Sequence, residues 1–244
     1  GLASTDDISL DLKSDTASGR GVNVINRGSG ATFIRATGPI SGVLGIRATN
    51  DVGSGEMFVD VADISGVDAA FFGNNYGVSD TFIRTRDVFS ESTGLQMSND
   101  VTTGNLTIIT RNVVTGSTGI SAVNQGTGAT SVTVQGSVTS ESGGGVSVFN
   151  DVQAQNLSVW TQDVQTGTGS GIGVSQEGSG SAYVRADGKI ASQGGTGIRV
   201  NTGVQAASVT VAAAQDVFGE DWGVLVGHSG SGGVAVVVAG DIVG

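Results

Sequence analysis

Residues 119–139 read Gly-Ile-Ser-Ala-Val-Asn-Gln-Gly-Thr-Gly-Ala-Thr-Ser-Val-Thr-Val-Gln-Gly-Ser-Val-Thr, and they contain one unit of a repeat that fills the chain. A small residue starts a short strand in which apolar and polar side chains alternate, as in a half-buried β-strand. An asparagine ends this strand, and a glycine-rich turn leads to a second alternating strand and then to a third. The stretch therefore predicts short strands joined by tight turns.

The pattern restarts every 24 to 26 residues along the 244-residue chain. Self-similarity at a fixed period of roughly 20–50 residues is typical of a solenoid. We interpret residues 1–20 as a partial leading coil and residues 21–244 as the repeat array. The expected coil starts are Gly21, Gly45, Ala70, Gly94, Gly119, Gly145, Gly171, Gly197 and Gly223.

Each coil carries three apolar positions at nearly constant offsets from its start. The first is a pair spaced by two residues, such as Ile120 and Ala122, which places both side chains on one face. The second lies about 13 residues in, such as Val132, and the third about 19 residues in, such as Val138. Three strands per coil with one apolar column each predict an all-β fold, a single-stranded parallel β-helix of about nine to ten coils around one core.

Some coils depart from the common pattern. Asn-Asp-Val occurs at 50–52, 99–101 and 150–152, whereas Gly-Ser-Gly or Gly-Thr-Gly occurs at 28–30, 126–128, 178–180 and 230–232. This alternation hints at a unit of two coils. The coils at 70–93 and 197–222 fit neither class, and in the latter coil the second apolar position is either Val209 or Val211.

A polar column follows the first strand of every coil, and eight of its nine members carry a side-chain amide. It consists of Asn26, Asn50, Asn75, Asn99, Asn124, Asn150, Gln176, Asn201 and His228. Amides recurring at one corner predict a ladder of stacked, mutually hydrogen-bonded side chains. Such a ladder sets register, because a slipped coil leaves a buried amide unpaired. We expect the least regular stacking at Gln176, at the early Asn201 and at His228.

Composition supports strands and turns and limits the partners. Glycine occurs 42 times, proline once and cysteine not at all, which favours glycine-rich turns and excludes disulfide scaffolds and cysteine metal sites. The net charge of −11 argues against nucleic acid and anionic membranes as partners. The longest apolar run, Val234–Ala239, is too short to span a membrane, so we expect no direct membrane insertion.

The repeat at 119–139 resembles the passenger repeats of large proteobacterial autotransporters (type V secretion), and related repeats occur in filamentous-haemagglutinin-like adhesins. The resemblance extends from about residue 8 to residue 244. It implies a right-handed β-helix exported to the bacterial cell surface, where such repeats serve adhesion, biofilm formation or display. The signal sequence, linker helix and translocator barrel of such proteins have no counterpart in residues 1–244. Since the chain opens and closes within repeats, we expect a processed piece of a longer protein.

Few residues suggest catalysis or metal binding. His228 lacks a motif-linked nucleophile and acid, which favours a polar column residue or a surface residue over a catalytic base.

Asp63 and Asp87 occupy the same turn in successive coils, as do Asp216 and Asp241, so each pair could lie ~5 Å apart and share a cation or a proton. Calcium prefers about six to eight oxygen ligands, which no loop supplies, and turn capping is the commoner role of such acids. The glycine-rich runs lack the lysine and helix of a phosphate loop. We predict no catalytic site, cofactor or metal, although calcium at the turn acids stays open.

The most promising surface lies on the second strand. By alternation, Phe33, Phe58 and Phe82 point outward on three consecutive coils, beside a row formed by Arg35, Asp60 and Arg84. Trp160, Tyr183 and Arg185 continue this face later in the chain. One interpretation is stabilisation of the sheet by pairs of neighbouring side chains. The other is an interaction face for lateral contacts or sugar stacking.

Three functions fit these patterns. The first, which we favour, is a non-enzymatic extracellular stalk with a structural or adhesive role, binding itself or surface glycans or proteins. The second is a self-assembling fibre or surface-layer subunit, because open solenoid ends invite end-to-end stacking. The third, a glycan-binding or glycan-cleaving β-helix, requires long loops around a cleft, and the nearly constant coil length leaves little room for them.

Overall fold

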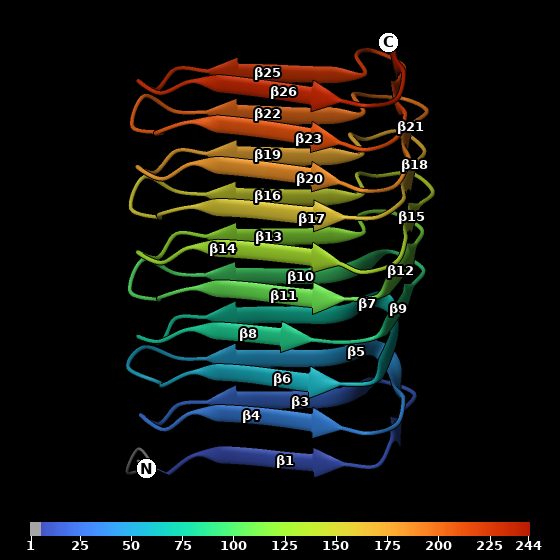
Figure 1. The fold of residues 1–244 in the computed structure, drawn as a ribbon. Coiled ribbons are helices and arrows are strands. Elements are labelled where there is room, and N and C mark those ends of the chain that lie inside the picture. Colours follow the sequence, from blue (N-terminus) through green and yellow to red (C-terminus); the bar gives the residue numbers. More distant parts are fainter. Residues whose placement is uncertain (1–5) are drawn as a thin grey trace.

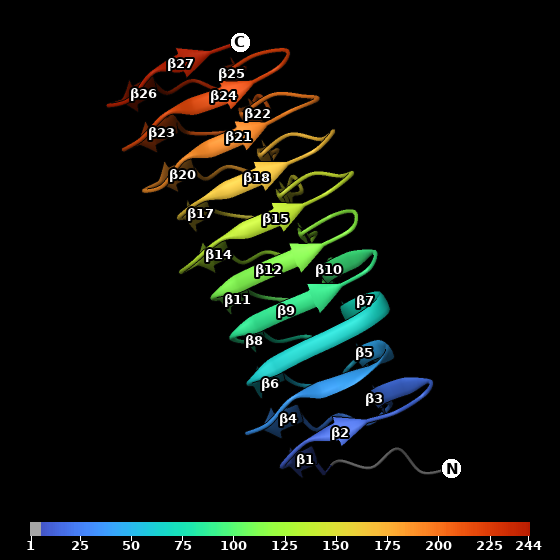
Figure 2. The ribbon, with the colours of Figure 1, turned by 90° about the vertical axis from the view of Figure 1, so that its right-hand side faces the viewer.

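The chain rises coil by coil around one axis from its N-terminus to its C-terminus (Figure 1). In this computed structural model, which describes residues 6–244, each strand pairs in parallel with its counterpart one coil away. As the chain rises, the near strands run to the right and the far strands to the left, so the β-helix is right-handed (Figure 1, Figure 2). The predicted all-β solenoid with three strands per coil is confirmed.

The second-strand face is a sheet of ten strands that faces the viewer in Figure 1. With ~4.8 Å between neighbouring strands, it makes a rod roughly 43 Å long. Its strands are β1 (Ile8–Leu12), β4 (Thr32–Ala36), β6 (Met57–Val61), β8 (Thr81–Arg84), β11 (Leu106–Thr110), β14 (Thr130–Val134), β17 (Leu157–Thr161), β20 (Ala182–Ala186), β23 (Val209–Ala213) and β26 (Val234–Val238).

A sheet of 17 strands bends around a corner and supplies the other two faces. Two long strands, β5 (Ile40–Asn50) and β7 (Asp63–Asn75), pass through the corner and belong to both faces. The first-strand face also contains β3 (Arg20–Asn26), β10 (Thr93–Asn99), β13 (Ile120–Asn124), β16 (Val146–Asn150), β19 (Ile172–Gln176), β22 (Ile198–Thr202) and β25 (Val224–His228). The third-strand face, turned to the viewer in Figure 2, adds β2 (Asp15–Thr16), β9 (Asp87–Ser90), β12 (Asn112–Thr115), β15 (Val138–Ser140), β18 (Val164–Thr166), β21 (Ile190–Ser192), β24 (Val217–Gly219) and β27 (Ile242–Val243).

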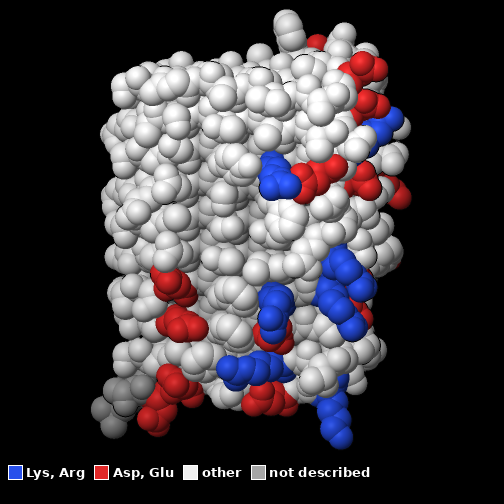
Figure 3. Space-filling model, in the orientation of Figure 1, with Lys and Arg blue, Asp and Glu red and all other residues white. Residues whose placement is uncertain are grey.

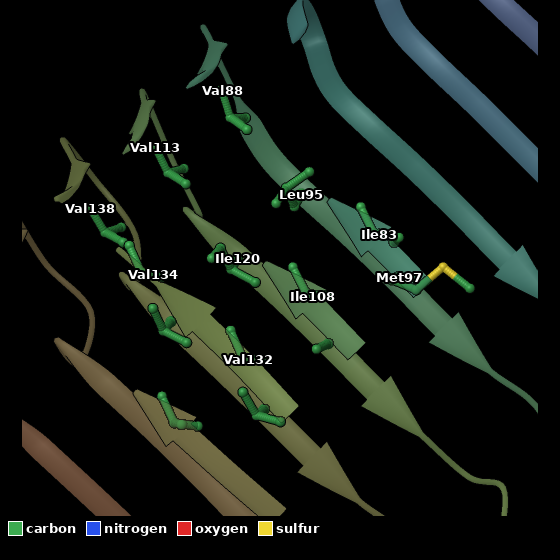
Figure 4. Packing of buried hydrophobic residues seen from close by; sticks show 14 of the residues in the cluster. Ile83, Val88, Leu95, Met97, Ile108, Val113, Ile120, Val132, Val134 and Val138 are labelled. Atoms are coloured by element: carbon green, nitrogen blue, oxygen red, sulfur yellow. The ribbon is translucent and has the colours of Figure 1, made fainter. Parts of the chain in front are cut away.

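The three faces close around one apolar core. Side chains from all three strands of a coil point toward one another in the interior, and each stacks on its counterpart in the next coil (Figure 4). Burying one valine or isoleucine in this way stabilises the fold by ~1.5–3 kcal/mol before the loss of chain entropy is counted. In the coil at 197–222, Val211 and not Val209 continues the second apolar column. Val211 pairs with Val184 and Val236, whereas Val209 pairs with Ala182.

Close contact at one corner explains the small residue that starts each first strand. A Cβ atom on Gly171 would lie 2.6 Å from the carbonyl oxygen of Gly197 and 2.7 Å from Cγ2 of Ile190. Real side chains do not tolerate such distances to a backbone oxygen. Glycine at this position therefore lets one coil lie directly on the next, and only Ala70 departs from it among the nine predicted starts.

The turns after the first strand take one of two forms in seven of the nine coils, and the two forms alternate from the coil at 21 to the coil at 145. In the coils that start at 45, 94, 145 and 197, the turn is closed by a backbone hydrogen bond over three residues, such as Thr103 N–H to the Asp100 carbonyl (3.0 Å). In the coils that start at 21, 70 and 119, an asparagine side chain closes it instead, as Asn75 Oδ1 accepts the N–H of Gly77 (2.9 Å). The coils at 70–93 and 197–222 therefore each take one of the two forms, and their predicted irregularity is wrong.

Candidate functional site

The polar column is buried inside the rod and does not form a surface site. Strand register stacks its members coil upon coil along the end of the first-strand face, and each is at most 1% exposed as far as Gln176. These residues are Asn26, Asn50, Asn75, Asn99, Asn124, Asn150 and Gln176. Their amides are therefore part of the scaffold.

The predicted amide-to-amide hydrogen bonds are not what the structure shows. Each amide donates to a carbonyl of its own turn or of a neighbouring turn, as Asn26 Nδ2 does to the Gly30 carbonyl (2.7 Å). Threonines connect successive coils: Asn75 Nδ2 donates to Thr81 Oγ1 (2.9 Å), which donates to Asn99 Oδ1 (2.7 Å). The coil spacing of ~4.8 Å would allow a direct amide ladder, but the amide nitrogens donate to backbone carbonyls instead. At Thr81 a threonine hydroxyl group bridges the amides of two successive coils.

The expected place of Asn201 in this column is wrong. Thr202 pairs in register with Gln176 and His228, whereas Asn201 points to the outer surface. The reason is strand parity, because a shift of one residue turns a side chain to the opposite face. Thr202 Oγ1 donates to His228 Nδ1 (2.6 Å), and His228 Nε2 donates to the Gly232 carbonyl (3.1 Å). The imidazole therefore extends the column and has a backbone carbonyl where a catalytic base would have an acid.

The outward face of the second strand brings the three predicted phenylalanines together. The ring centroids of Phe33 and Phe58 lie 6.2 Å apart, and those of Phe58 and Phe82 lie 5.2 Å apart with their planes at 12°. All three rings are half-buried. Ring pairs at such distances contribute ~0.5–1.5 kcal/mol beyond the area they bury. The stack runs parallel to the axis and joins three coils.

The predicted row of charges flanks this stack. Arg84 holds Asp60 with two hydrogen bonds, one of them from Nε to Oδ1 (2.8 Å), and this contact raises the pKa of Arg84 further above its ordinary value. The guanidinium of Arg35 lies 5.2 Å from the ring centroids of both Phe33 and Phe58. Charged side chains gather over the N-terminal coils and the right-hand border of this face, and the upper left is uncharged (Figure 3).

A second cluster lies further along the same face, where the sequence predicts its continuation. Trp160 and Arg185 pair in register, with the guanidinium 5.9 Å from the ring centroid. Asp187 accepts hydrogen bonds from Arg185 Nε (2.7 Å) and Trp160 Nε1 (2.8 Å), which together lower the pKa of this carboxyl group. Tyr183 stands beside this cluster on the outer surface, 40% exposed. The aromatic surface is therefore divided into two separate clusters.

The acids at the next corner are held by arginines. Asp63 and Asp87 pair in register, but each carboxylate binds a guanidinium from one coil further on. Arg86 donates to Asp63 at 3.1 and 2.8 Å, and Arg111 donates to Asp87 through Nε (3.0 Å) and its terminal nitrogen. The contact with Arg111 lowers the pKa of Asp87. Each of the two carboxylates therefore faces its own guanidinium group.

The later acids of this corner cap turns. Asp216 Oδ1 accepts the backbone N–H of Asp241 (3.0 Å), and Asp163 Oδ1 accepts that of Lys189 (2.8 Å). Each carboxylate thereby fastens the start of the third strand in the next coil. Within residues 6–244 no group of three or more His, Cys, Asp or Glu side chains is placed to hold a metal ion.

Sequence reasoning missed the arginines that hold Asp63 and Asp87. A usable signal exists, because Arg86 follows Asp63 by 23 residues and Arg111 follows Asp87 by 24 residues. An acid and a base separated by one coil period at one corner predict an ion pair between coils. Asp187 was missed for a different reason: it lies just beyond the alternating strand and reaches back to it.

Comparison with known proteins finds no matching family model, no similar curated protein and no similar solved structure. The part of the chain that the structure describes contains no helix long and apolar enough to cross a membrane.

Proposed function

We propose that the chain is a non-enzymatic segment of an extracellular stalk, with a structural or adhesive role, in a bacterial cell-surface protein of the autotransporter or adhesin type. The observation that carries this proposal is the uniform length of the coils and of the connections between their strands. Within residues 6–244 no connection between strands is longer than those at 51–56, 100–105, 151–156 and 203–208. A rod with uniform coils and short turns supplies length and rigidity, which are the properties that a stalk needs.

The state of the acids supports a non-enzymatic role. A carboxyl group that donates a proton near neutral pH needs a raised pKa, as in glycan hydrolysis. Asp87 and Asp187 have lowered pKa values because Arg111 and Arg185 hold them. Both carboxylates are therefore ionised near neutral pH, Asp87 beside Arg111 of the next coil and Asp187 beside Arg185 of its own coil.

Surface exposure is testable on intact cells that produce the parent protein. Antibodies against the purified chain are expected to label intact, unpermeabilised cells, and protease added outside is expected to remove the label. Labelling that appears only after permeabilisation contradicts the proposal. Electron microscopy of the purified chain separates the stalk from the self-assembling fibre: isolated short rods support the stalk, and continuous fibres with a ~4.8 Å repeat favour assembly.

The aromatic stack is proposed as the contact face of the stalk. The variant with Phe58→Ser and Phe82→Ser is expected to fold, because both rings lie outside the core and are half-buried. Cell-to-cell aggregation or adhesion to a coated surface is expected to fall in this variant. The matched control is Ser131→Ala, a small change in the same outward column two coils beyond Phe82. Unchanged adhesion in the phenylalanine variant contradicts the role of this face.

A further inference from the structure

The first-strand face is hollowed between β10 and β22. The groove has a volume of about 570 Å³ and runs across the coils that start at 94 to 197. Sites for small ligands usually have volumes of roughly 300–1,000 Å³. The groove is distinct from the aromatic stack, which lies on the second-strand face.

The groove exists because three successive coils lack a long side chain at one outward position. Ser121, Ser147 and Gly173 stack in register there and form the floor. The same column carries Gln96 before them and Arg199 after them, so long side chains stand at both ends. An outward position filled by small residues between two long ones leaves a trough parallel to the axis.

Two walls border this trough. On one side stand the turns that precede the first strands, with Thr118, Gly144 and Ser170 lining the groove. These turns project past the strands at the right-hand side of the β-helix (Figure 2). On the other side stand Phe149, half-buried, and Asn201. Asn201, which strand parity turns outward from the polar column, therefore lines a surface groove.

Among the polar side chains that line the groove, Ser175 donates a hydrogen bond to Glu177 (3.2 Å), and several others make none in the described part of the chain. The side chains of Gln96, Ser147 and Asn201 have no hydrogen-bonding partner within residues 6–244, and Arg199 has no ion-pair partner there. Arginine is the single charged residue of the lining, surrounded by hydroxyl and amide groups and one aromatic ring. Such a lining suits a ligand that is rich in hydroxyl groups, has apolar ring faces and carries little negative charge.

We infer that this groove binds an extended acidic oligosaccharide lying along the axis, with a carboxylate at Arg199 and a sugar ring against Phe149. Arginine binds carboxylates with two parallel hydrogen bonds. The serine hydroxyls repeat at the coil spacing of ~4.8 Å, which matches a ligand of repeating units. This inference rests on the proposed surface location and names the class of ligand that the stalk meets there.

Two other polymers fit the groove poorly. A peptide bound as an added strand needs free backbone groups, and those of β13, β16 and β19 are used in pairing between coils. Nucleic acid binds through many basic residues, whereas this groove offers one and the chain has a net charge of −11. The ligand chemistry is therefore that of a sparsely charged glycan.

Native gel electrophoresis of the whole chain tests this inference, with hyaluronan, whose carboxylates alternate with neutral sugars, in one gel and neutral dextran in another. Hyaluronan is expected to retard the chain, and dextran is expected to retard it less. The Ser147→Trp variant, which fills the trough, is expected to abolish retardation. Arg199→Gln is expected to weaken apparent binding about tenfold, equivalent to ~1.4 kcal/mol, because it removes the charged partner of the carboxylate. Arg47→Gln, in the same column outside the groove, is the matched control and is expected to change nothing.

The inference is overturned if hyaluronan does not retard the chain, if dextran retards it equally, or if Arg47→Gln has the same effect as Arg199→Gln. Retardation that persists in Ser147→Trp also overturns it, provided that circular dichroism and thermal unfolding match the parent chain. Failure of the intact-cell labelling with retention of groove binding refutes the surface location alone. The reverse result refutes the groove alone.

Discussion

The N-terminal coils, residues 21–118, and the later coils, residues 119–222, share one interior but have different exteriors. Four ion pairs link adjacent coils in the first region, such as Arg111 with Asp87. In the later region the single pair, Arg185 with Asp187, lies within one coil. Rings and guanidinium groups cover the N-terminal coils, whereas small hydroxyl residues dominate the groove of the later ones.

This comparison distinguishes the buried apolar columns, which hold the rod together, from the outer side chains, which can vary. The apolar columns continue through both regions without a break, so burial supplies the common stability. Ion pairs on an exposed surface contribute ~0–1 kcal/mol each. Outer residues therefore change with little cost, and the two regions can present different surfaces on one scaffold.

The largest expected effect tests the shared interior. Ile83→Ala in the N-terminal coils and Ile172→Ala in the later coils each remove a side chain that is 0% exposed. Each variant is expected to lose ~2–5 kcal/mol of unfolding free energy, since a cavity remains where the branched side chain was. Urea unfolding followed by circular dichroism measures this loss. If the interior is equivalent, the two losses agree within about 1 kcal/mol.

A large difference between the two isoleucine variants contradicts the shared interior. The matched surface control is Val52→Ala, because Val52 is 79% exposed and packs little. Its unfolding free energy is expected to stay within about 0.5 kcal/mol of the parent chain.

The polar column distinguishes the two regions by a smaller amount. Asn99 Oδ1 accepts a hydrogen bond from Thr81, whereas Asn150 Oδ1 and Thr130 Oγ1 are buried without a partner in residues 6–244. Asn99→Ala is therefore expected to cost ~1–3 kcal/mol, and Asn150→Ala is expected to cost about 1 kcal/mol less. Urea midpoints of the two variants measure the difference. Equal losses, or a larger loss for Asn150→Ala, contradict the role of the threonine bridge.

The interior could be predicted from the sequence because it is periodic. Side chains such as Val138 and Val164 recur at one offset, and burial demands an apolar residue at each recurrence. The turn classes were harder to predict from the sequence, since Asn75 closes its turn by accepting the N–H of Gly77 without a Gly-Ser-Gly run. The prediction that Asn201 belongs to the polar column was wrong because it rested on residue type, whereas strand parity decides which side chain points inward.

The candidate surfaces could be predicted only in part. The stack of Phe33, Phe58 and Phe82 follows from alternation, because large side chains in one outward column must touch. The groove is defined by the opposite property, the absence of long side chains at Ser121, Ser147 and Gly173. Small polar residues have no positional signature in a chain rich in glycine and serine, so the register of five coils was needed to reveal it.

The smallest expected effect concerns acid and the ion pairs of the N-terminal coils. Arg111 lowers the pKa of Asp87 in the folded chain below the ordinary value of 3.8. As pH falls, the unfolded state takes up the proton first, so the stabilisation is complete above 3.8 and is lost as pH drops through the lower folded pKa. Arg111→Gln is therefore expected to reduce the loss of stability between about pH 7 and about pH 3 by a small amount, because the pair is exposed and solvent screens it. Arg199→Gln, which removes an unpaired arginine from the later coils, is expected to leave the acid dependence unchanged. Urea midpoints at the two pH values measure both, and an equal change in the two variants would show that net charge, not the Arg111–Asp87 contact, sets the acid response.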